Sequence, residues 1–93
     1  MKIQIDPHTL ERAVERGTDV TEIEEVLANG VPLTAKRGRL GRGKVYDFRQ
    51  VRLGRYFEQK RVEVYYVVED DVIITVTVYV FYGKWEVENA SAL

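Results

Sequence analysis

The chain has no cysteine and only one histidine, one serine and two prolines among its 93 residues. The lack of cysteine excludes disulfides, thiolate catalysis and cysteine-based zinc sites. A single histidine excludes a metal site built from several imidazoles, and we expect neither a metal nor another cofactor. The only serine, Ser91, does not lie in the strand-turn-helix pattern that serine hydrolases need.

Long hydrophobic runs are also missing. The longest apolar run, VIITVTVYVFY, has 11 residues, which is too short for a helix that crosses a bilayer. The N-terminal MKIQID lacks the apolar core of a signal peptide. With 45% hydrophobic and 31% charged residues, the composition is typical of a small soluble domain. We expect a cytoplasmic protein without a membrane contact, one domain over residues 1–86 and a disordered tail over residues 87–93.

Positive charge is concentrated in the middle of the chain, although the formal net charge is −1. Residues 36–61 contain ten basic and two acidic residues, whereas the segments before and after it are acidic. The stretch KRGRLGRGK at 36–44, which we expect to be a flexible loop, holds five of these cations and three glycines. A basic surface of this kind is typical of polyanion-binding proteins. Alternatively, these charges are solvated and pair with the acidic ends.

The N-terminal part predicts a short strand and two helices. KIQI alternates like a strand. In DPHTLERAVERG, Asp6 suits an N-cap, Pro7 the first helical position and Gly17 the position after the helix. A capping box of Thr21 and Glu24 opens a second helix that stops at Asn29-Gly30. The apolar stripes that we expect to be buried are Leu10, Ala13 and Val14 on the first helix and Ile23, Val26 and Leu27 on the second.

The rest of the chain predicts strands at residues 44–51, 61–68 and 72–82. Asp70-Asp71 forms one turn, and either Gly54 or the segment 58–60 forms the other. The order β-α-α-β-β-β predicts an α+β fold, with both helices on one face of an antiparallel sheet of about four strands. The last strand then turns Ile74, Val76, Val78 and Val80 toward the helices and Ile73, Thr75, Thr77, Tyr79 and Phe81 to the other face.

Two features suggest a nucleic-acid site. Rings and hydroxyls beside cations on the helix-free face match the way in which sheets hold single-stranded nucleic acid, although Tyr and Thr are also common strand residues. His8, Arg12 and Arg16 share one side of the first helix, where they could bind an anion. An imidazole titrates near neutral pH and can serve as an acid or base. These helix residues can meet Thr77 and Tyr79 only if the helix lies at a sheet edge.

Three segments carry a resemblance to a known family: HTLERAVERG, EIEEVLANG, and VEVYYVVEDDVIITVTVY with FYGKW after it. Over roughly residues 6 to 86 the chain resembles the small bacterial family catalogued as domain of unknown function 4258. Its members resemble RelE/ParE-like toxins of the barnase-like ribonuclease fold, which act on RNA without a metal. The resemblance implies a catalytic set of His8 and Arg12 from a His-x-x-x-Arg motif and Thr77 and Tyr79 from a Thr-x-Tyr segment.

The sequence thus predicts a small RNA-binding protein and, as its activity, a metal-independent endoribonuclease of toxin type with a cognate antitoxin protein as partner. The alternative is a non-catalytic module that binds RNA or a protein partner. The sequence sets no oligomeric state. The residues that we expect to contact nucleic acid are Lys36, Arg37, Arg39, Arg42, Lys44, Arg49, Arg52, Arg55, Lys60 and Arg61.

Overall fold

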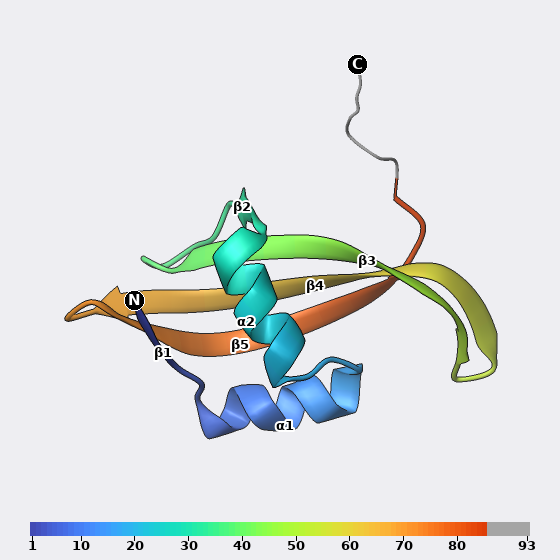
Figure 1. The fold of residues 1–93 in the computed structure, drawn as a ribbon, viewed down its shortest axis with the longest axis horizontal. Coiled ribbons are helices and arrows are strands. Elements are labelled where there is room, and N and C mark those ends of the chain that lie inside the picture. Colours follow the sequence, from blue (N-terminus) through green and yellow to red (C-terminus); the bar gives the residue numbers. More distant parts are fainter. Residues whose placement is uncertain (86–93) are drawn as a thin grey trace, which may run out of the picture.

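The computed structural model describes residues 1–85, and the tail predicted over 87–93 lies outside them. Two helices and five strands form one α+β unit (Figure 1). Neither helix is long and apolar enough to cross a membrane, a finding that concerns these residues alone. The elements are β1 (Lys2–Gln4), α1 (Pro7–Arg16), α2 (Val20–Asn29), β2 (Val31–Leu33), β3 (Leu40–Arg52), β4 (Arg55–Glu69) and β5 (Val72–Gly83).

The sheet has the strand order β1-β5-β4-β3-β2. Strands β2 to β5 pair antiparallel, whereas β1 runs parallel to β5. The predicted α+β class and the two N-terminal helices are confirmed. The structure adds β2 and makes the sheet a mixed one of five strands. With three residues, one of them Pro32, β2 is too short to show the alternation that predicts a strand.

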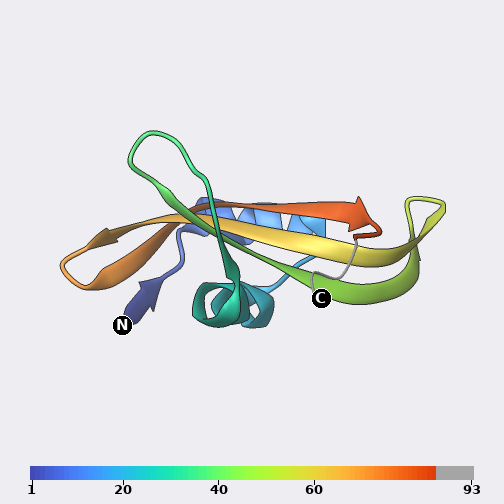
Figure 2. The same ribbon diagram turned by 90° about the horizontal axis from the view of Figure 1, so that it is seen from above.

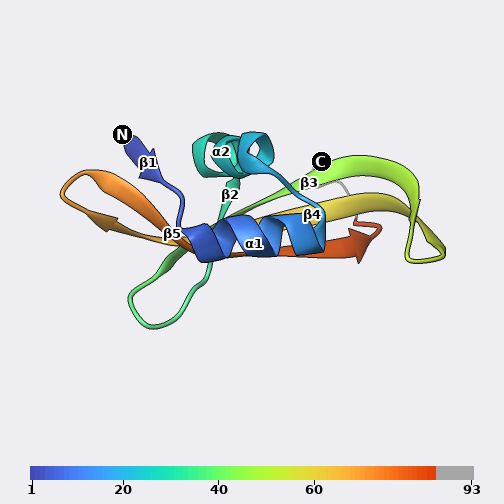
Figure 3. The same ribbon diagram turned by 90° about the horizontal axis from the view of Figure 1, so that it is seen from below.

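Helix α2 crosses one face of the sheet, which we call the helix face (Figure 1). Its side chains Ile23, Val26 and Leu27 are buried, as predicted. They form the core together with Val62, Val64, Tyr66 and Val78 of the sheet and Ala13 of α1. The opposite face carries no helix in residues 1–85, and we call it the open face (Figures 2 and 3).

Helix α1 lies along the edge of β5 rather than over the sheet (Figure 3). The Arg16 guanidinium donates to the Val78 carbonyl at 2.7 Å, and Thr75 Oγ1 accepts from the Asp6 amide at 3.0 Å. The helix thereby covers strand groups that would otherwise face water. Only a narrow strip of a helix is buried at an edge. The predicted stripe is therefore wrong for two of its three residues: Ala13 is buried, whereas Leu10 and Val14 are exposed.

Three side chains from the β-hairpins hold the C-terminal end of α1. The last carbonyls of a helix have no partner within the helix and need donors from elsewhere. Here each of three successive carbonyls accepts one hydrogen bond, at 2.6 to 2.8 Å. The pairs are Arg52 to Glu15, Tyr82 to Arg16 and Lys60 to Gly17. These bonds place α1, and thus His8 and Arg12, at a defined position along the edge.

A β-bulge in β5 changes which side chains face the helices. Tyr65 pairs with Thr77 and Tyr66 with Thr75, so that Val76 is the extra residue. Beyond a bulge the alternation of a strand is shifted by one residue. The prediction for the first half of β5 is therefore wrong. Ile73 packs against the core and Thr75 is buried on the helix side, where its hydroxyl donates to Thr9 Oγ1 at 2.9 Å.

The chain reversals follow from local chemistry. Asp70 and Asp71 both have positive φ and turn β4 into β5, as predicted. Leu53 and Gly54, with φ of 52° and 81°, form the other hairpin turn, and two such residues suit a tight two-residue turn. The predicted capping box is wrong, because Asp19 caps α2 by accepting from the Glu22 amide at 2.9 Å. The competing N-cap lies two residues earlier in the chain.

Candidate nucleic-acid interface

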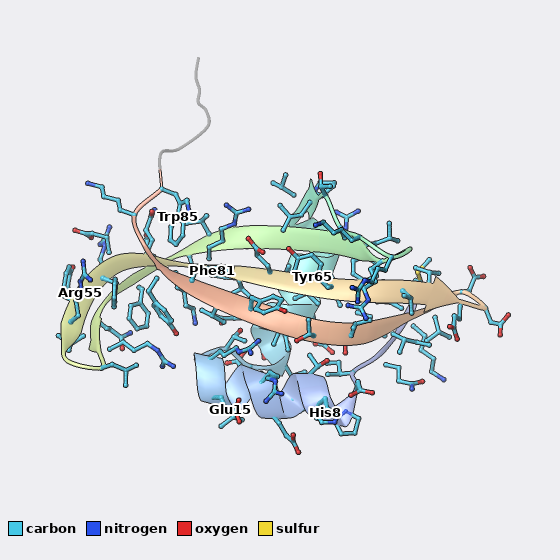
Figure 4. The ribbon with its side chains drawn as sticks, turned by 180° about the vertical axis from the view of Figure 1, so that it is seen from behind. His8, Glu15, Arg55, Tyr65, Phe81 and Trp85 are labelled. Carbon is cyan, nitrogen blue, oxygen red and sulfur yellow. The ribbon has the colours of Figure 1, made fainter. Side chains whose placement is uncertain are left out.

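Three aromatic rings lie together on the open face (Figure 4). Tyr79 contacts Tyr65 edge-on, with 5.9 Å between ring centroids, and stacks beside Phe81 at 6.3 Å. The Arg16 guanidinium lies over the Tyr79 ring at 4.9 Å. Tyr79 and Phe81 are 41% and 47% exposed, so that two adjoining rings are open to solvent. This cluster, which we call the ring cluster, presents flat apolar surface to solvent.

Tyr65 is held in place by Glu63, whose carboxylate is fixed in turn by Arg61. Its hydroxyl donates to Glu63 Oε1 at 2.8 Å, and Arg61 Nε lies 2.9 Å from the other carboxylate oxygen. Burial and the hydrogen bond to the Glu63 carboxylate raise the pKa of Tyr65 to about 12. The phenol is therefore protonated near neutral pH and acts as a fixed donor rather than as an acid or base.

The glycines of β3 make room for these side chains. A Cβ atom on Gly41 would lie 2.8 Å from the Tyr65 ring, and one on Gly43 would lie 2.9 Å from Leu33. Gly41 thus serves close packing against the Tyr65 ring, whereas the end of the Leu33 side chain can move to make room for a Cβ at position 43. The expectation of a flexible loop over 36–44 is wrong for its second half, because residues 40–44 belong to β3.

A basic loop rises on the open side of the sheet (Figure 2), and its residues line one hollow with Tyr65 and Tyr79. It comprises residues 34–39, between β2 and β3. Within residues 1–85, the side chains of Lys36, Arg37 and Arg39 make no ion pair or hydrogen bond. The loop and the rings of Tyr65 and Tyr79 border an open hollow of about 350 Å³. It is lined by Thr34, Ala35, Lys36, Arg37, Arg39, Tyr65, Thr77 and Tyr79.

A second hollow, of about 380 Å³, adjoins the first. Its lining includes His8 and Arg12 of α1 and Thr75, Val76 and Thr77 of β5. Thr77 lines both hollows; of the other predicted catalytic residues, His8 and Arg12 line only the second hollow and Tyr79 only the first. This placement depends on α1 lying at the sheet edge. His8 is 80% exposed, with Nδ1 3.6 Å from Glu11, and Arg12 lies 3.2 Å from Glu15.

The predicted nucleic-acid contacts fall into two groups by position. Four cations lie on the helix side, where each bonds to a group of the helices or their ends: Arg42 to the Gly30 carbonyl, Lys44 to Glu25, Arg52 to Glu15, and Lys60 to Glu22 and Gly17. The others lie in the basic loop, beside Glu63 or in the β3–β4 hairpin: Lys36, Arg37, Arg39, Arg61, Arg49 and Arg55.

Sequence reasoning did not select Tyr65 or Phe81 as site residues, and it grouped Arg16 with His8 and Arg12 rather than with Tyr79. Alternation places Tyr65 and Phe81 on the predicted open face, but it does not show which rings meet. The contact between Tyr65 and Tyr79 depends on the strand register, and that between Arg16 and Tyr79 on the edge position of α1. Both arise from tertiary structure, for which the sequence carries no local signal.

Residues 1–85 contain no group of three or more side chains placed to hold a metal ion. No curated protein and no solved structure matches the chain. Nothing in these comparisons links it to the RelE- or ParE-like toxins, and that part of the resemblance stays a prediction. The family model described as "Domain of unknown function (DUF4258)" matches residues 5–80. The chain therefore belongs to the DUF4258 family.

Proposed function

We propose that this protein binds single-stranded RNA on the open face of its sheet. The observation that supports this most strongly is that the Tyr65 and Tyr79 rings and the three loop cations line one hollow. Tyr79 and Phe81 expose much of their surface, and the adjoining loop carries Lys36, Arg37 and Arg39. Rings offer stacking surface to bases, while lysine and arginine attract phosphates.

A single strand fits this surface better than a duplex. Bases in a duplex are stacked on one another and cannot reach a ring on a protein surface. Each base that stacks on an aromatic side chain contributes about 1–3 kcal/mol. Tyr79 and Phe81 lie nearly parallel, with 24° between their planes, so two consecutive bases can stack there. The cations of the loop then lie beside the strand, where its phosphates run.

Fluorescence anisotropy with a labelled 12-mer of oligouridine, at several salt concentrations, tests this proposal. Changing Lys36, Arg37 and Arg39 together to Ala should weaken binding and lower the slope of log K against log salt by about 2, at about 0.7 per lost phosphate contact. The matched control replaces Lys2, Lys44 and Lys84, three cations outside the site, by Ala. Equal losses in both triple variants, or no binding by the wild type at low salt, would contradict the proposal.

A second candidate function is cleavage of the bound strand, because Thr77 joins the ring hollow to the hollow of His8 and Arg12. In such a reaction the ribose 2′-oxygen attacks the adjacent phosphorus as a base removes its proton. The bond to the 5′-oxygen breaks, and that oxygen takes up a proton, which leaves a 2′,3′-cyclic phosphate. His8 would move the protons, Arg12 would balance the phosphate charge, Thr77 would orient the phosphate and Tyr79 would hold a base.

Incubation of the pure protein with the same RNA in EDTA separates the two candidates. If the protein cuts RNA, His8→Ala should lower the rate about 10²- to 10⁴-fold and leave the melting temperature unchanged, since the side chain is exposed. Binding without cutting would show that the protein is a non-catalytic RNA-binding module, which is the alternative given in the sequence analysis. A toxin role and a cognate antitoxin belong to the catalytic candidate alone.

A further inference from the structure

Arg16, the last residue of α1, joins this helix to the ring cluster. Strand β1 pairs with residues 72–74 of β5, and within residues 1–85 the rest of that edge of β5 has no strand beside it. The Arg16 guanidinium donates to the Val78 carbonyl on this edge at 2.7 Å and lies over the Tyr79 ring at 4.9 Å. One side chain therefore satisfies a carbonyl of the strand edge and contacts an exposed ring.

The position of this guanidinium is fixed from both ends of the residue. The Arg16 backbone carbonyl accepts from the Tyr82 hydroxyl at 2.6 Å, while the side chain ends on the Val78 carbonyl. A guanidinium is planar and donates within its plane, so it can keep this hydrogen bond while its flat face lies on a ring. The Tyr79 ring thus rests against a group that is itself held in place.

Tyr79 remains an exposed side chain in spite of this contact. Its exposed fraction is 41%, and Tyr65 of the neighbouring strand contacts its ring edge-on at 5.9 Å. Binding that immobilises a mobile side chain costs free energy, because the side chain loses rotamer freedom. Arg16 restricts the Tyr79 ring before a ligand arrives, so that less of this cost falls on binding.

A second arginine makes the same kind of contact on the helix side. The Arg52 guanidinium lies over the Tyr82 ring at 4.9 Å and donates to the Glu15 carbonyl at 2.8 Å. The Tyr82 ring packs against two phenylalanine rings, and its hydroxyl bonds to the end of α1. Arg52 thus stabilises the fold, whereas Arg16 holds a ring that is open to solvent. The two contacts therefore allow a matched comparison.

We propose that Arg16 is a positioning residue of the RNA site, which holds the Tyr79 ring in the orientation that receives a base. This inference rests on the proposed function. A ring that is already fixed loses little freedom when a base stacks on it, so the strand binds more tightly than it would to a mobile ring. Arg16 then acts through Tyr79 and not through a phosphate, which distinguishes it from the three cations of the basic loop.

A double-mutant cycle tests this role, with the anisotropy of the labelled 12-mer of oligouridine as the readout. Arg16→Gln should weaken binding about 3- to 10-fold, the effect of one side chain that must be immobilised. It should leave the slope of log K against log salt unchanged, because no phosphate contact is lost. In a Tyr79→Leu background, Arg16→Gln should change the affinity less than about 2-fold, since the ring that Arg16 holds is gone.

Arg52→Gln is the matched control. It removes the corresponding contact from Tyr82 and should lower the melting temperature without weakening RNA binding. If Arg16→Gln does not fold, Arg16→Lys takes its place in the cycle, because lysine keeps a donor for the Val78 carbonyl but has no planar face.

The outcomes separate this inference from the proposed function. Equal losses in the wild-type and Tyr79→Leu backgrounds, or an unchanged affinity of Arg16→Gln, would overturn the positioning role while RNA binding stands. A salt slope lowered by about 0.7 would also overturn it, since Arg16 would then contact a phosphate. If the wild type binds no RNA even at low salt, the proposed function and this inference are both wrong.

Discussion

The two faces of the sheet carry the same kinds of residue but use them differently. On the helix face, cations and phenols bond to groups of α1 and α2, as Lys60 does to Glu22 and Tyr46 to Glu25, at 2.8 and 2.6 Å. On the open face, two rings are about half exposed, and the three loop cations bond to no side chain within residues 1–85. Residue type alone therefore does not separate structural from binding positions.

Strand alternation and the edge position of α1 determine which cations and rings face the helices and which face the open side. The basic segment 36–61 contains ten cations, of which four bond to the helices or their ends. The sequence left open that the basic residues pair with the acidic ends of the chain, and this is what the four helix-side cations do with groups of the N-terminal helices. For the remaining cations the polyanion-binding surface stays a prediction. A run of positive charge can serve both purposes when a strand divides it between two faces.

The largest effect on stability is expected from the helix face. Lys60 is 11% exposed and donates at 2.8 Å to both the Gly17 carbonyl and Glu22. Lys60→Met leaves both acceptors without this cation and should lower the free energy of unfolding by about 3 kcal/mol. Lys36→Met in the basic loop should change it by less than ~0.5 kcal/mol. Urea denaturation followed by circular dichroism measures the free energy of unfolding of both variants. Similar losses for Lys60→Met and Lys36→Met would contradict the contrast between the two faces.

Adjacent residues of β5 sharpen the comparison. Val78 is fully buried on the helix side, whereas Thr77 lines the hollows of the open face. Val78→Ala should cost about 1–3 kcal/mol through the cavity it leaves, and Thr77→Ala less than ~1 kcal/mol. Thr77→Ala should weaken RNA binding more than Val78→Ala does. If Thr77→Ala is the more destabilising change in the same urea experiment, the two faces are assigned the wrong way round.

A smaller effect is expected from Gly41, whose added Cβ would meet the Tyr65 ring at 2.8 Å. Gly41→Ala should cost about 1–2 kcal/mol, since the Tyr65 ring must shift to make room for the added Cβ, and should weaken RNA binding. Gly83→Ala is the control, since its Cβ would lie 3.7 Å from Trp85, an ordinary contact. Melting curves and anisotropy on both variants decide. Equal behaviour would show that Tyr65 is not held by close packing.

The smallest effect concerns alkaline pH. The pKa of Tyr65 is raised to about 12 in the folded state, whereas a free phenol titrates near 10. The unfolded chain therefore loses this proton first, and the stabilisation is complete below pH 10 and falls as the pH rises toward 12. Between pH 9 and pH 11, the Tyr65→Phe variant should lose less stability than the wild type. The difference between the two losses should be under about 1 kcal/mol. Urea midpoints at both pH values measure it, and identical losses would contradict the assignment.

Much of the fold was predictable because its signals are local. Asp6, Pro7 and Gly17 bound α1, and the alternation of residues 61–68 and 72–82 predicted the long strands. Errors arose where tertiary structure decides. The bulge at Val76 shifted the faces of β5, and the docking of α1 on an edge left Leu10 and Val14 exposed. Neither the bulge nor the edge position of α1 can be recognised from the local sequence pattern.

The candidate site was predictable in its parts but not in its assembly. His8, Arg12, Thr77 and Tyr79 were chosen on motifs, and the structure brings them around two adjoining hollows. The motifs could not indicate that Tyr65 and Arg16 complete the ring cluster, since these contacts join segments 14 to 63 residues apart. The motifs also could not show which of the ten cations of the basic segment bond to the helices, because this depends on the strand register.

The central claim is that RNA binds the open face and not the helix face. Titration of ¹⁵N-labelled protein with a 12-mer of oligouridine, followed by amide chemical shifts, tests it most directly. The largest shifts should fall on residues 34–39 of the basic loop, on Tyr65 and on residues 77–81 of β5, while α2 remains unchanged. Shifts concentrated on α2 and the helix-side ends of β3, or no shifts at all, would contradict the account.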